Sequence, residues 1–368
     1  MTAAHRWAAV ALGVLLVFTL PVVWLHRPTP GSEISASALL ARVRAAQGHP
    51  WSGYVVSQGS LQLPVATRFT DLGSLFGEQN KLRVWWRGDD AWRVDRLTTA
   101  GEDDLVHDGE QTTTYSFEDA EAVTSTDPDI RLPRTADLLP PVLVGRLLRD
   151  VDAAEATRID TRRVGGRVAP GLRLRPASPQ SSIDHVDLWA DPETGVPLRV
   201  EVYGGSAGPA GLTSEIRSFD PATPGTDRVT LTPTATTEQS YDDVLDIADA
   251  ANQYAPLRPP RSVAGLPETS ATDGAVGVYG TGLTQLIAIP LRGREAAPLR
   301  RQIAVTPGVV VDGTGTLVAV GPLGVLLTGA GSDGGFLLAG TVTGATLRTA
   351  ARDLERGVRF TDDERGRR

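Results

Sequence analysis

The sequence predicts a mainly β protein with few helices, preceded by one apolar segment long enough to span a membrane. Three observations lead to this prediction. Short runs of alternating apolar and polar residues recur along the chain, glycine and proline account for 39 and 26 of the 368 residues, and the stretch from Trp7 to Leu25 has no charged side chain. Alternation is typical of strands with one buried face, and glycine and proline form the turns between them.

The apolar stretch from Trp7 to Leu25 is interpreted as an N-terminal transmembrane helix. Its 19 residues would extend over roughly the 30 Å of a hydrocarbon core. A cleaved signal peptide is the alternative, but no small-x-small site follows closely, and Trp7 and Trp24 bracket the run as interfacial aromatics do. We therefore expect an uncleaved, single-pass anchor in the cell membrane, with the C-terminal domains on the extracytoplasmic side.

Composition argues against a nucleic-acid-binding protein and against a lipid-anchored one. The net charge of −8 argues against a nucleic-acid partner, because such proteins need a basic surface. The chain has no cysteine, so it has neither disulfides nor a cysteine for a lipid anchor, and the redox compartment stays undecided.

The first part of the soluble chain is expected to begin with a helix at 36–47, for which Ser32, Ser35 and Ser37 all offer N-caps. Period-two alternation then predicts one large antiparallel sheet. Its strands are expected at 53–58, 81–87, 90–97, 105–107, 111–117, 121–124, 157–163, 171–175, 183–190, 196–203 and 213–219.

A Leu/Val-rich helical insert is expected at 135–150, with Pro140 and Pro141 kinking or restarting it. Two helices cannot cover a sheet of this size, and a sheet needs a second layer. Either the aromatic residues of the sheet pack ordinarily, or an apolar concave face remains that could hold a ligand. The insert would then be its lid or plug.

A helix is predicted at 240–253, with Ser240 as its N-cap, followed by a stiff boundary at 256–260. The remainder is predicted to be a small α+β domain that ends in a helix at 345–356. The predicted division is a membrane anchor and linker at 1–31, a large β domain at 32–255, a small domain at 256–358 and a mobile tail at 359–368. Strands of the small domain are expected at 275–279, 285–290, 308–311, 316–320, 324–328 and 336–340.

Two glycine-rich motifs are interpreted as turns. Residues 204–208 match G-x-S-x-G, but no helix follows to complete a nucleophile elbow. Residues 329–334 match G-x-G-x-x-G, but a strand follows where a dinucleotide site needs a helix N-terminus.

The ionisable residues give no catalytic signal. No two of the five histidines have metal-ligand spacing, and no serine can be assigned a histidine base. His185, between Asp184 and Asp187, is interpreted as part of a solvated strand face rather than a catalytic dyad. The sequence therefore predicts no catalytic residue, metal or cofactor, and a protein that is not an enzyme.

The hairpin at 188–201, with Trp189, Asp191, Gly195 and Pro197 placed around its turn, resembles an element of the LolA-like superfamily. The segments 279–286 and 337–350 resemble the second domain of its periplasmic sigma-E factor regulatory members, the RseB/MucB family, which are related to the outer-membrane lipoprotein carriers. The resemblance implies a curved antiparallel half-barrel whose hollow is covered by helices and binds lipid or acyl chains, plus a small α+β C-terminal domain. Thr281 departs from the acidic position usual in that family.

We therefore expect a membrane-tethered, exported lipid- or lipoprotein-binding regulator that senses acyl ligands and modulates an anti-sigma factor or another envelope protein. A lipid or lipoprotein carrier is the alternative, and an enzyme on the same scaffold a remote one. The side chains expected to line the apolar ligand site are Leu82, Val84, Trp86, Trp92, Leu138, Leu139, Val142, Leu143, Leu198 and Val200.

Overall fold

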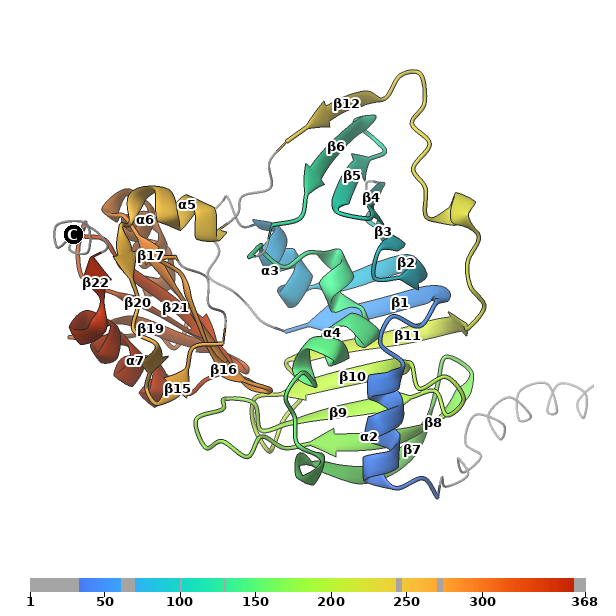
Figure 1. The fold of residues 1–368 in the computed structure, drawn as a ribbon, viewed down its shortest axis with the longest axis horizontal. Helices are drawn as coiled ribbons and strands as arrows, with labels where there is room; N and C mark the ends of the chain where they lie inside the picture. Colours follow the sequence, from blue (N-terminus) through green and yellow to red (C-terminus); the bar gives the residue numbers. More distant parts are fainter. Residues whose placement is uncertain are drawn as a thin grey trace, which may run out of the picture.

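A computed structural model describes residues 33–60, 70–99, 101–128, 130–242, 247–269 and 274–360. In this part of the chain the architecture is mainly β, with two separate sheets and helices packed against each (Figure 1). The expected membrane segment from Trp7 to Leu25 and residues 361–368 of the expected tail lie outside these ranges. None of the helices within them has the length and apolarity that a membrane crossing needs.

The larger sheet has twelve strands in the order β12-β6-β5-β4-β3-β2-β1-β11-β10-β9-β8-β7 and is open, because β12 and β7 form its two edges. Neighbours are antiparallel except β12, which runs parallel to β6. The strands are β1 (Trp51–Gly59), β2 (Gln79–Gly88), β3 (Ala91–Leu97), β4 (Glu102–Asp108), β5 (Gln111–Ser116), β6 (Glu121–Thr126), β7 (Ala156–Val164), β8 (Arg167–Leu174), β9 (His185–Ala190), β10 (Pro197–Tyr203), β11 (Leu212–Asp220) and β12 (Glu238–Tyr241).

The turn between β9 and β10 shows how local chemistry fixes the register. The buried carboxylate of Asp191 accepts hydrogen bonds from the backbone N–H and the hydroxyl of Thr194, at 2.9 and 2.8 Å. Gly195 has φ +81°, and a Cβ there would lie 2.6 Å from the backbone oxygen of Arg42. Only glycine satisfies both the left-handed turn and this close approach.

Helices cover one face of the larger sheet (Figure 1). Helix α2 (Ala36–Ala45) begins at Ser35, whose hydroxyl accepts from the backbone N–H of Ala38, and it packs over β7 and β8. The 3-10 helix η2 (Thr135–Leu138) ends before the prolines, and α4 (Pro140–Leu147) starts on them and packs on β10. Helix α3 (Thr70–Gly77), which the sequence did not predict, contacts β1 and β2. The insert at 135–150 is thus confirmed, including its restart.

The second sheet has six strands in the order β16-β17-β21-β20-β19-β18. Its strands are β16 (Gly277–Thr281), β17 (Thr284–Leu291), β18 (Val310–Asp312), β19 (Gly315–Val320), β20 (Leu323–Thr328) and β21 (Gly335–Gly340). Helix α7 (Gly344–Gly357) covers one face and α6 (Gly293–Ala304) the other, while α5 (Ile247–Tyr254) packs on β17. Short pairs complete this part, formed by β13 (Leu257–Arg258) with β22 (Arg359–Phe360) and by β14 (Ser262–Val263) with β15 (Leu266–Pro267).

The loop between β8 and β9 joins the two sheets through main-chain bonds. Ser181 forms a β-bridge with Val342, and the backbone N–H of Ser182 donates to Thr341 at 3.1 Å. The backbone N–H of Thr343 donates to Gln180 at 2.8 Å, and Leu283 of the second sheet's β16–β17 turn packs into the core of the first. The two sheets therefore meet over a defined backbone interface.

One prediction was wrong, and two helices, α3 and α6, were not predicted. Ser240 is not a helix N-cap, because residues 238–241 form β12 on the free edge of β6 and the helix begins only at Ile247. No helix was predicted over 293–304, yet α6 forms there, with Pro298 inside it, and buries Ala296 and Ile303 against the sheet. The coarse prediction of a mainly β fold is confirmed, and the larger sheet proves to be open. The half-barrel curvature and the domain boundaries stay predictions.

Candidate ligand-binding site

The ten side chains predicted to line a ligand site meet on the helix-covered face of the larger sheet. Eight of them are buried in one apolar cluster, and Val142 and Leu143 of α4 pack against it half-buried. Segment η2 is tied to the sheet, because the Ser214 hydroxyl donates to the Leu138 carbonyl at 2.6 Å. The sheet, η2 and α4 therefore form one apolar layer, closed in this structure by side-chain packing.

A stack of rings continues this layer toward the β4 side. Trp86 and Trp92 are cross-strand partners, and their rings lie parallel with centroids 5.3 Å apart. The imidazole of His107 stacks on Trp92 at 5.0 Å, and the Arg134 guanidinium lies 5.1 Å from the Trp92 ring centroid. Burial lowers the pKa of His107, so its ring is neutral at neutral pH.

Arginines from the η2 region and α4 surround this end of the layer. Asp137 accepts two hydrogen bonds from Arg131, at 2.8 and 3.0 Å, and one from Arg146, at 2.6 Å. Arg134 binds both oxygens of Asp127, at 2.7 and 2.6 Å. Burial alone would raise the pKa of Asp137, but the bonds from Arg131 and the charge of Arg146 outweigh it and hold that pKa below its usual value.

A cavity of about 330 Å³ opens where the rings meet the arginines. Its apolar wall includes Trp86, Trp92 and Val142, and its polar wall includes Arg131 and Arg134. Arg149, another lining residue, is exposed and has no charged partner among the described residues. A cavity with an apolar wall and an uncompensated cation at its rim suits an amphipathic ligand with an anionic end.

The sequence predicted the apolar wall but not the arginines. The apolar residues were found because alternation assigns each strand residue to a face. Arg131 and Arg134 lie just before the insert at 135–150, and Arg146 and Arg149 lie near its end; this charge at both ends was the available signal. The convergence of these four side chains on one cavity depends on how η2 and α4 pack over the sheet.

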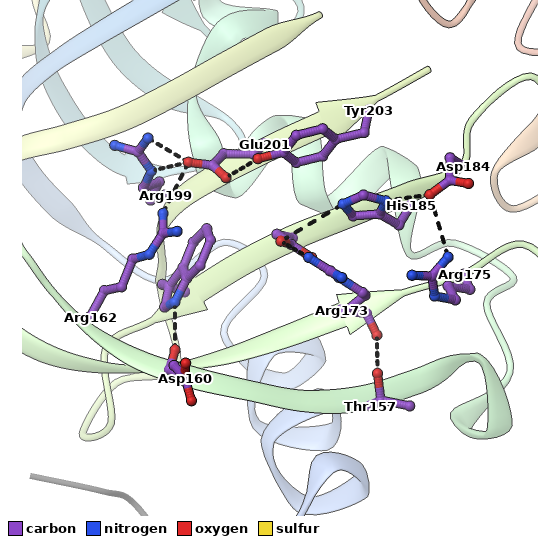
Figure 2. A network of polar contacts seen from close by, with 12 residues as sticks. Thr157, Asp160, Arg162, Arg173, Arg175, Asp184, His185, Arg199, Glu201 and Tyr203 are labelled. Atoms are coloured by element: carbon purple, nitrogen blue, oxygen red, sulfur yellow. Dashed lines mark hydrogen bonds and ion pairs between the residues drawn. The ribbon is translucent and has the colours of Figure 1, made fainter. Parts of the chain in front are cut away.

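The opposite face of the larger sheet carries a buried polar network (Figure 2). Arg173 donates to both oxygens of Asp187, at 2.7 and 2.6 Å. Glu201 accepts from the Tyr203 hydroxyl at 2.6 Å and from Arg162 at 3.1 Å. Burial, and next the hydrogen bond to Glu201, raise the pKa of Tyr203 to about 12. These hydrogen-bonded charged pairs bury the strands on this face without a covering layer of helices in the described part of the chain.

The interpretation of His185 as part of a solvated face was wrong. The side chain is 6% exposed, its ring stacks on Tyr203 with centroids 4.2 Å apart, and its Nδ1 lies 2.6 Å from an Asp184 oxygen (Figure 2). Its Nε2 lies 3.9 Å from Asp187. Because carboxylates face both ring nitrogens, this arrangement suits a structural role rather than a catalytic base.

Three carboxylates on the same face as this network approach one another. Ligand oxygens of Asp95, Glu102 and Asp104 lie within 4.8 Å of each other, a spacing that could hold a cation. Arg93 already donates to Asp95 and Asp104, each at 2.6 Å, and Arg83 donates to Glu102. Burial and the charge of Asp95 raise the pKa of Asp104 to about 8. Arg83 and Arg93 supply two positive charges for three carboxylates. The remaining negative charge is neutralised more simply by a proton on Asp104 than by a metal ion.

Both glycine motifs are turns, as predicted. Residues 204–208 connect β10 to β11, and residues 329–334 connect β20 to β21. In the second turn the carbonyl oxygens accept from the buried Arg300 of α6, at 2.7 Å for Gly331 and 2.8 Å for the neighbouring Thr328. The loop therefore anchors a helix instead of cradling a phosphate.

Comparison with known proteins gives likenesses at the level of structure. No protein-family model matches the chain, and no curated protein matches it. A crystal structure of MucB is similar with a TM-score of 0.47 and 16% identity, over 88% of this chain and 97% of that one. A MucA/MucB complex from Pseudomonas aeruginosa is similar with a TM-score of 0.49 and 16% identity, over 88% and 98%. A LolA superfamily protein from Nitrosomonas europaea is similar with a TM-score of 0.26 and 11% identity, over 54% and 98%. Solved structures of MucB and of a LolA superfamily protein are thus among those similar to this chain, at 16% identity or less.

Proposed function

We propose that this chain is a membrane-tethered extracytoplasmic regulator. In this proposal it binds the acyl chain of a lipid or lipoprotein between the larger sheet and η2–α4, and it modulates an envelope partner of the anti-sigma type. The sheet acts as a half-barrel, with η2–α4 as its lid. The observation that carries the proposal is the cavity whose wall of Trp86, Trp92 and Val142 adjoins the apolar cluster and whose rim carries the free charge of Arg149.

The lid is the part of the apolar layer best suited to move. The sheet residues of the layer are fixed by their ladders, whereas Val142, Leu143 and Leu147 of α4 are only half-buried. Apolar contacts have no preferred direction, so an acyl chain can replace the α4 side chains without leaving a polar group unpaired, while the bond from Ser214 to Leu138 keeps η2 in place. A ligand that binds the lid-open state shifts the population toward it, and a partner that contacts the lid would detect the shift.

The acyl site can be tested with the delipidated full-length chain and a fluorescent fatty acid. We expect saturable uptake and a change in tryptophan fluorescence from Trp86 and Trp92. Val142→Glu should weaken binding at least tenfold, because it buries a charge against the acyl chain. Val311→Glu, at an exposed position of the second sheet, is the matched control and should bind as wild type.

The headgroup part of the proposal has its own measurement. Arg149→Gln should weaken binding of the fatty acid more than binding of the matching uncharged alcohol, because only the acid carries a charge for Arg149 to attract. Absence of uptake by the wild-type chain would show that the acyl proposal is wrong. Equal losses for acid and alcohol would remove the headgroup role alone.

The membrane tether separates this proposal from the carrier alternative. A carrier must diffuse between membranes, whereas a tethered protein remains near one bilayer. The intact mass of the mature protein decides between the two. A mass that includes residues 1–30 supports the tethered regulator, and their loss favours a freely diffusing carrier.

A further inference from the structure

Strand β12 is held to the larger sheet almost entirely by its main chain. The backbone N–H of Glu238 donates to Ala120 at 2.8 Å, and that of Asp242 donates to Thr124 at 3.1 Å. Glu238 and Gln239 are exposed, Tyr241 is 82% exposed, and no side chain of β12 makes a hydrogen bond or ion pair with another described residue. Little of its attachment therefore depends on its own sequence.

The segment that leads to β12 is also loosely attached. Between Asp220 and Glu238, Pro224 and Val229 are the buried residues, and the backbone oxygen of Pro224 accepts from Arg87. The threonine turn directly before the strand bonds within itself, since the backbone N–H of Thr234 donates to the Thr237 hydroxyl at 3.0 Å. Elements with little buried surface open at low free energy, so β12 is poised to leave the sheet.

Without β12, strand β6 would present an open edge. After Glu121 it reads Ala-Val-Thr-Ser-Thr, with no charge, proline or bulge in its pairing with β5. Such an edge readily accepts another extended chain. Strand β12 therefore occupies what is otherwise a site for strand addition.

The charges around this site favour a different occupant. Glu238 stands directly opposite Glu121 in the β12–β6 pairing, and like charges opposite one another destabilise a sheet. Glu118, Asp119 and Asp242 are exposed nearby. No lysine or arginine occurs between Arg96 and Arg131 or between Arg228 and Arg258, so the hairpins of β4–β6 and the β12 segment offer no compensating charge.

We propose that the edge of β6 is an acceptor site for a basic, extended segment of a partner protein, which adds parallel to β6 in place of β12. Lysine or arginine opposite Glu121 would turn a repulsive pair into an attractive one. A second copy of this chain would bring the same acidic strand and the same repulsion. This inference does not depend on the acyl site, which lies on the helix-covered face, so either proposal can fail alone.

Proline substitutions in the full-length chain can open the site selectively. The N–H groups of Glu238 and Asp242 point toward β6, so by alternation that of Ser240 does too, while that of Gln239 points to solvent. Ser240→Pro should release β12 and speed amide hydrogen exchange at Thr124, whose carbonyl faces β12, but not at Val123, which faces β5. Gln239→Pro is the matched control and should leave both amides protected.

Two synthetic peptides then test the partner's chemistry on the Ser240→Pro chain. One has the sequence of residues 234–242, TATTEQSYD, and the other carries lysine at the position of Glu238. The lysine peptide should bind about three- to tenfold more tightly at low salt, and the difference should shrink in concentrated salt. Both peptides should restore the protection of Thr124.

Three outcomes would overturn the proposal. They are equal affinity of the two peptides, no binding by either to a folded Ser240→Pro chain, and dimerisation of that chain without peptide, which would make a second copy the occupant. If Ser240→Pro does not fold, single substitutions at Glu238 in the otherwise wild-type chain still test the charge argument. Glu238→Lys should then slow amide exchange of β12 relative to Glu238→Gln, and equal exchange rates would contradict the charge argument.

Discussion

The two faces of the larger sheet are both buried, but by different chemistry. On the helix-covered face, residues such as Leu198 and Val200 pack against α4 and its neighbours with no polar partner. On the other face, Asp187 and Glu201 are buried by arginine and tyrosine side chains that bond to them. The first face is stabilised by the burial of apolar surface area, and the second by hydrogen bonds and ion pairs of defined geometry.

This difference indicates where a ligand can enter. Apolar contacts can be exchanged for the methylene groups of a ligand at small cost, because no hydrogen bond is lost. Opening the polar face would leave a charged group unpaired in a poorly solvated position. The helix-covered face is therefore the adaptable one, and the polar face holds the strand positions constant while the lid moves.

The largest expected effect is a cavity in the apolar face. Leu198→Ala should lower the free energy of unfolding by about 2–5 kcal/mol, because Leu198 is fully buried and its neighbours belong to two layers that cannot both collapse into the space. Urea unfolding followed by circular dichroism measures the change. Val311→Ala, at a position that is 67% exposed, should stay within about 0.5 kcal/mol of wild type. Similar losses for the two variants would mean that the apolar face is not the main core.

A second variant tests whether geometry holds the polar face. Asp187→Asn should cost about 1–3 kcal/mol, since it weakens two charge-assisted bonds from Arg173. A double-mutant cycle with Arg173→Met should give a clear coupling energy. The more exposed pair of Arg348 and Asp312 is the control, and its coupling energy should be clearly smaller than that of Asp187 and Arg173, because solvent screens it. Equal couplings would contradict the idea of a specifically locked face.

A third expected effect is a pH dependence of stability from Asp104. Its pKa is about 8 in the folded protein against 3.8 as the ordinary value, so unfolding releases a proton at intermediate pH. Rising pH therefore favours the unfolded chain. The stability due to the protonated pair with Asp95 is complete below about pH 4 and declines up to about pH 8, by at most about 1.4 kcal/mol per pH unit.

Replacement by asparagine should remove this dependence. Unfolding free energies measured between pH 5 and pH 8 should fall less steeply for Asp104→Asn than for wild type. Asp103→Asn changes the exposed neighbour on the same strand and should leave the slope unchanged. A wild-type slope retained in Asp104→Asn would assign the proton to another group.

Much of the fold could be predicted because it depends on local signals. The hairpins of the larger sheet follow from alternation and from turns such as Asp108-Gly109, where Gly109 has φ +64°. The ten apolar site residues could be assigned to a single face for the same reason. Both kinds of prediction need only neighbouring residues, and a strand alternates whatever it pairs with.

The predictions that were wrong depend on distant partners. Residues around Ser240 carry helix-start signals, yet the edge of β6, more than a hundred residues earlier in the chain, makes them a strand. The pattern around His185 indicated a solvated strand face, and it could not show that neighbouring strands would bury that side chain. The arginines of the candidate site were missed for the same reason, because their convergence is set by the packing of η2 and α4.

The β-bridge between Ser181 and Val342 has a consequence for how the protein can be taken apart. Besides its main-chain bonds, the joint has side-chain donors, because Gln180, Ser181 and Ser182 each donate to a main-chain carbonyl of the second sheet's part of the chain. Alanine scanning across it should therefore find these three positions sensitive. Because these bonds cross between the two parts, a protease that cuts the chain between β12 and α5 would nick it without parting its halves. The nicked protein should elute at its original size until a denaturant is added.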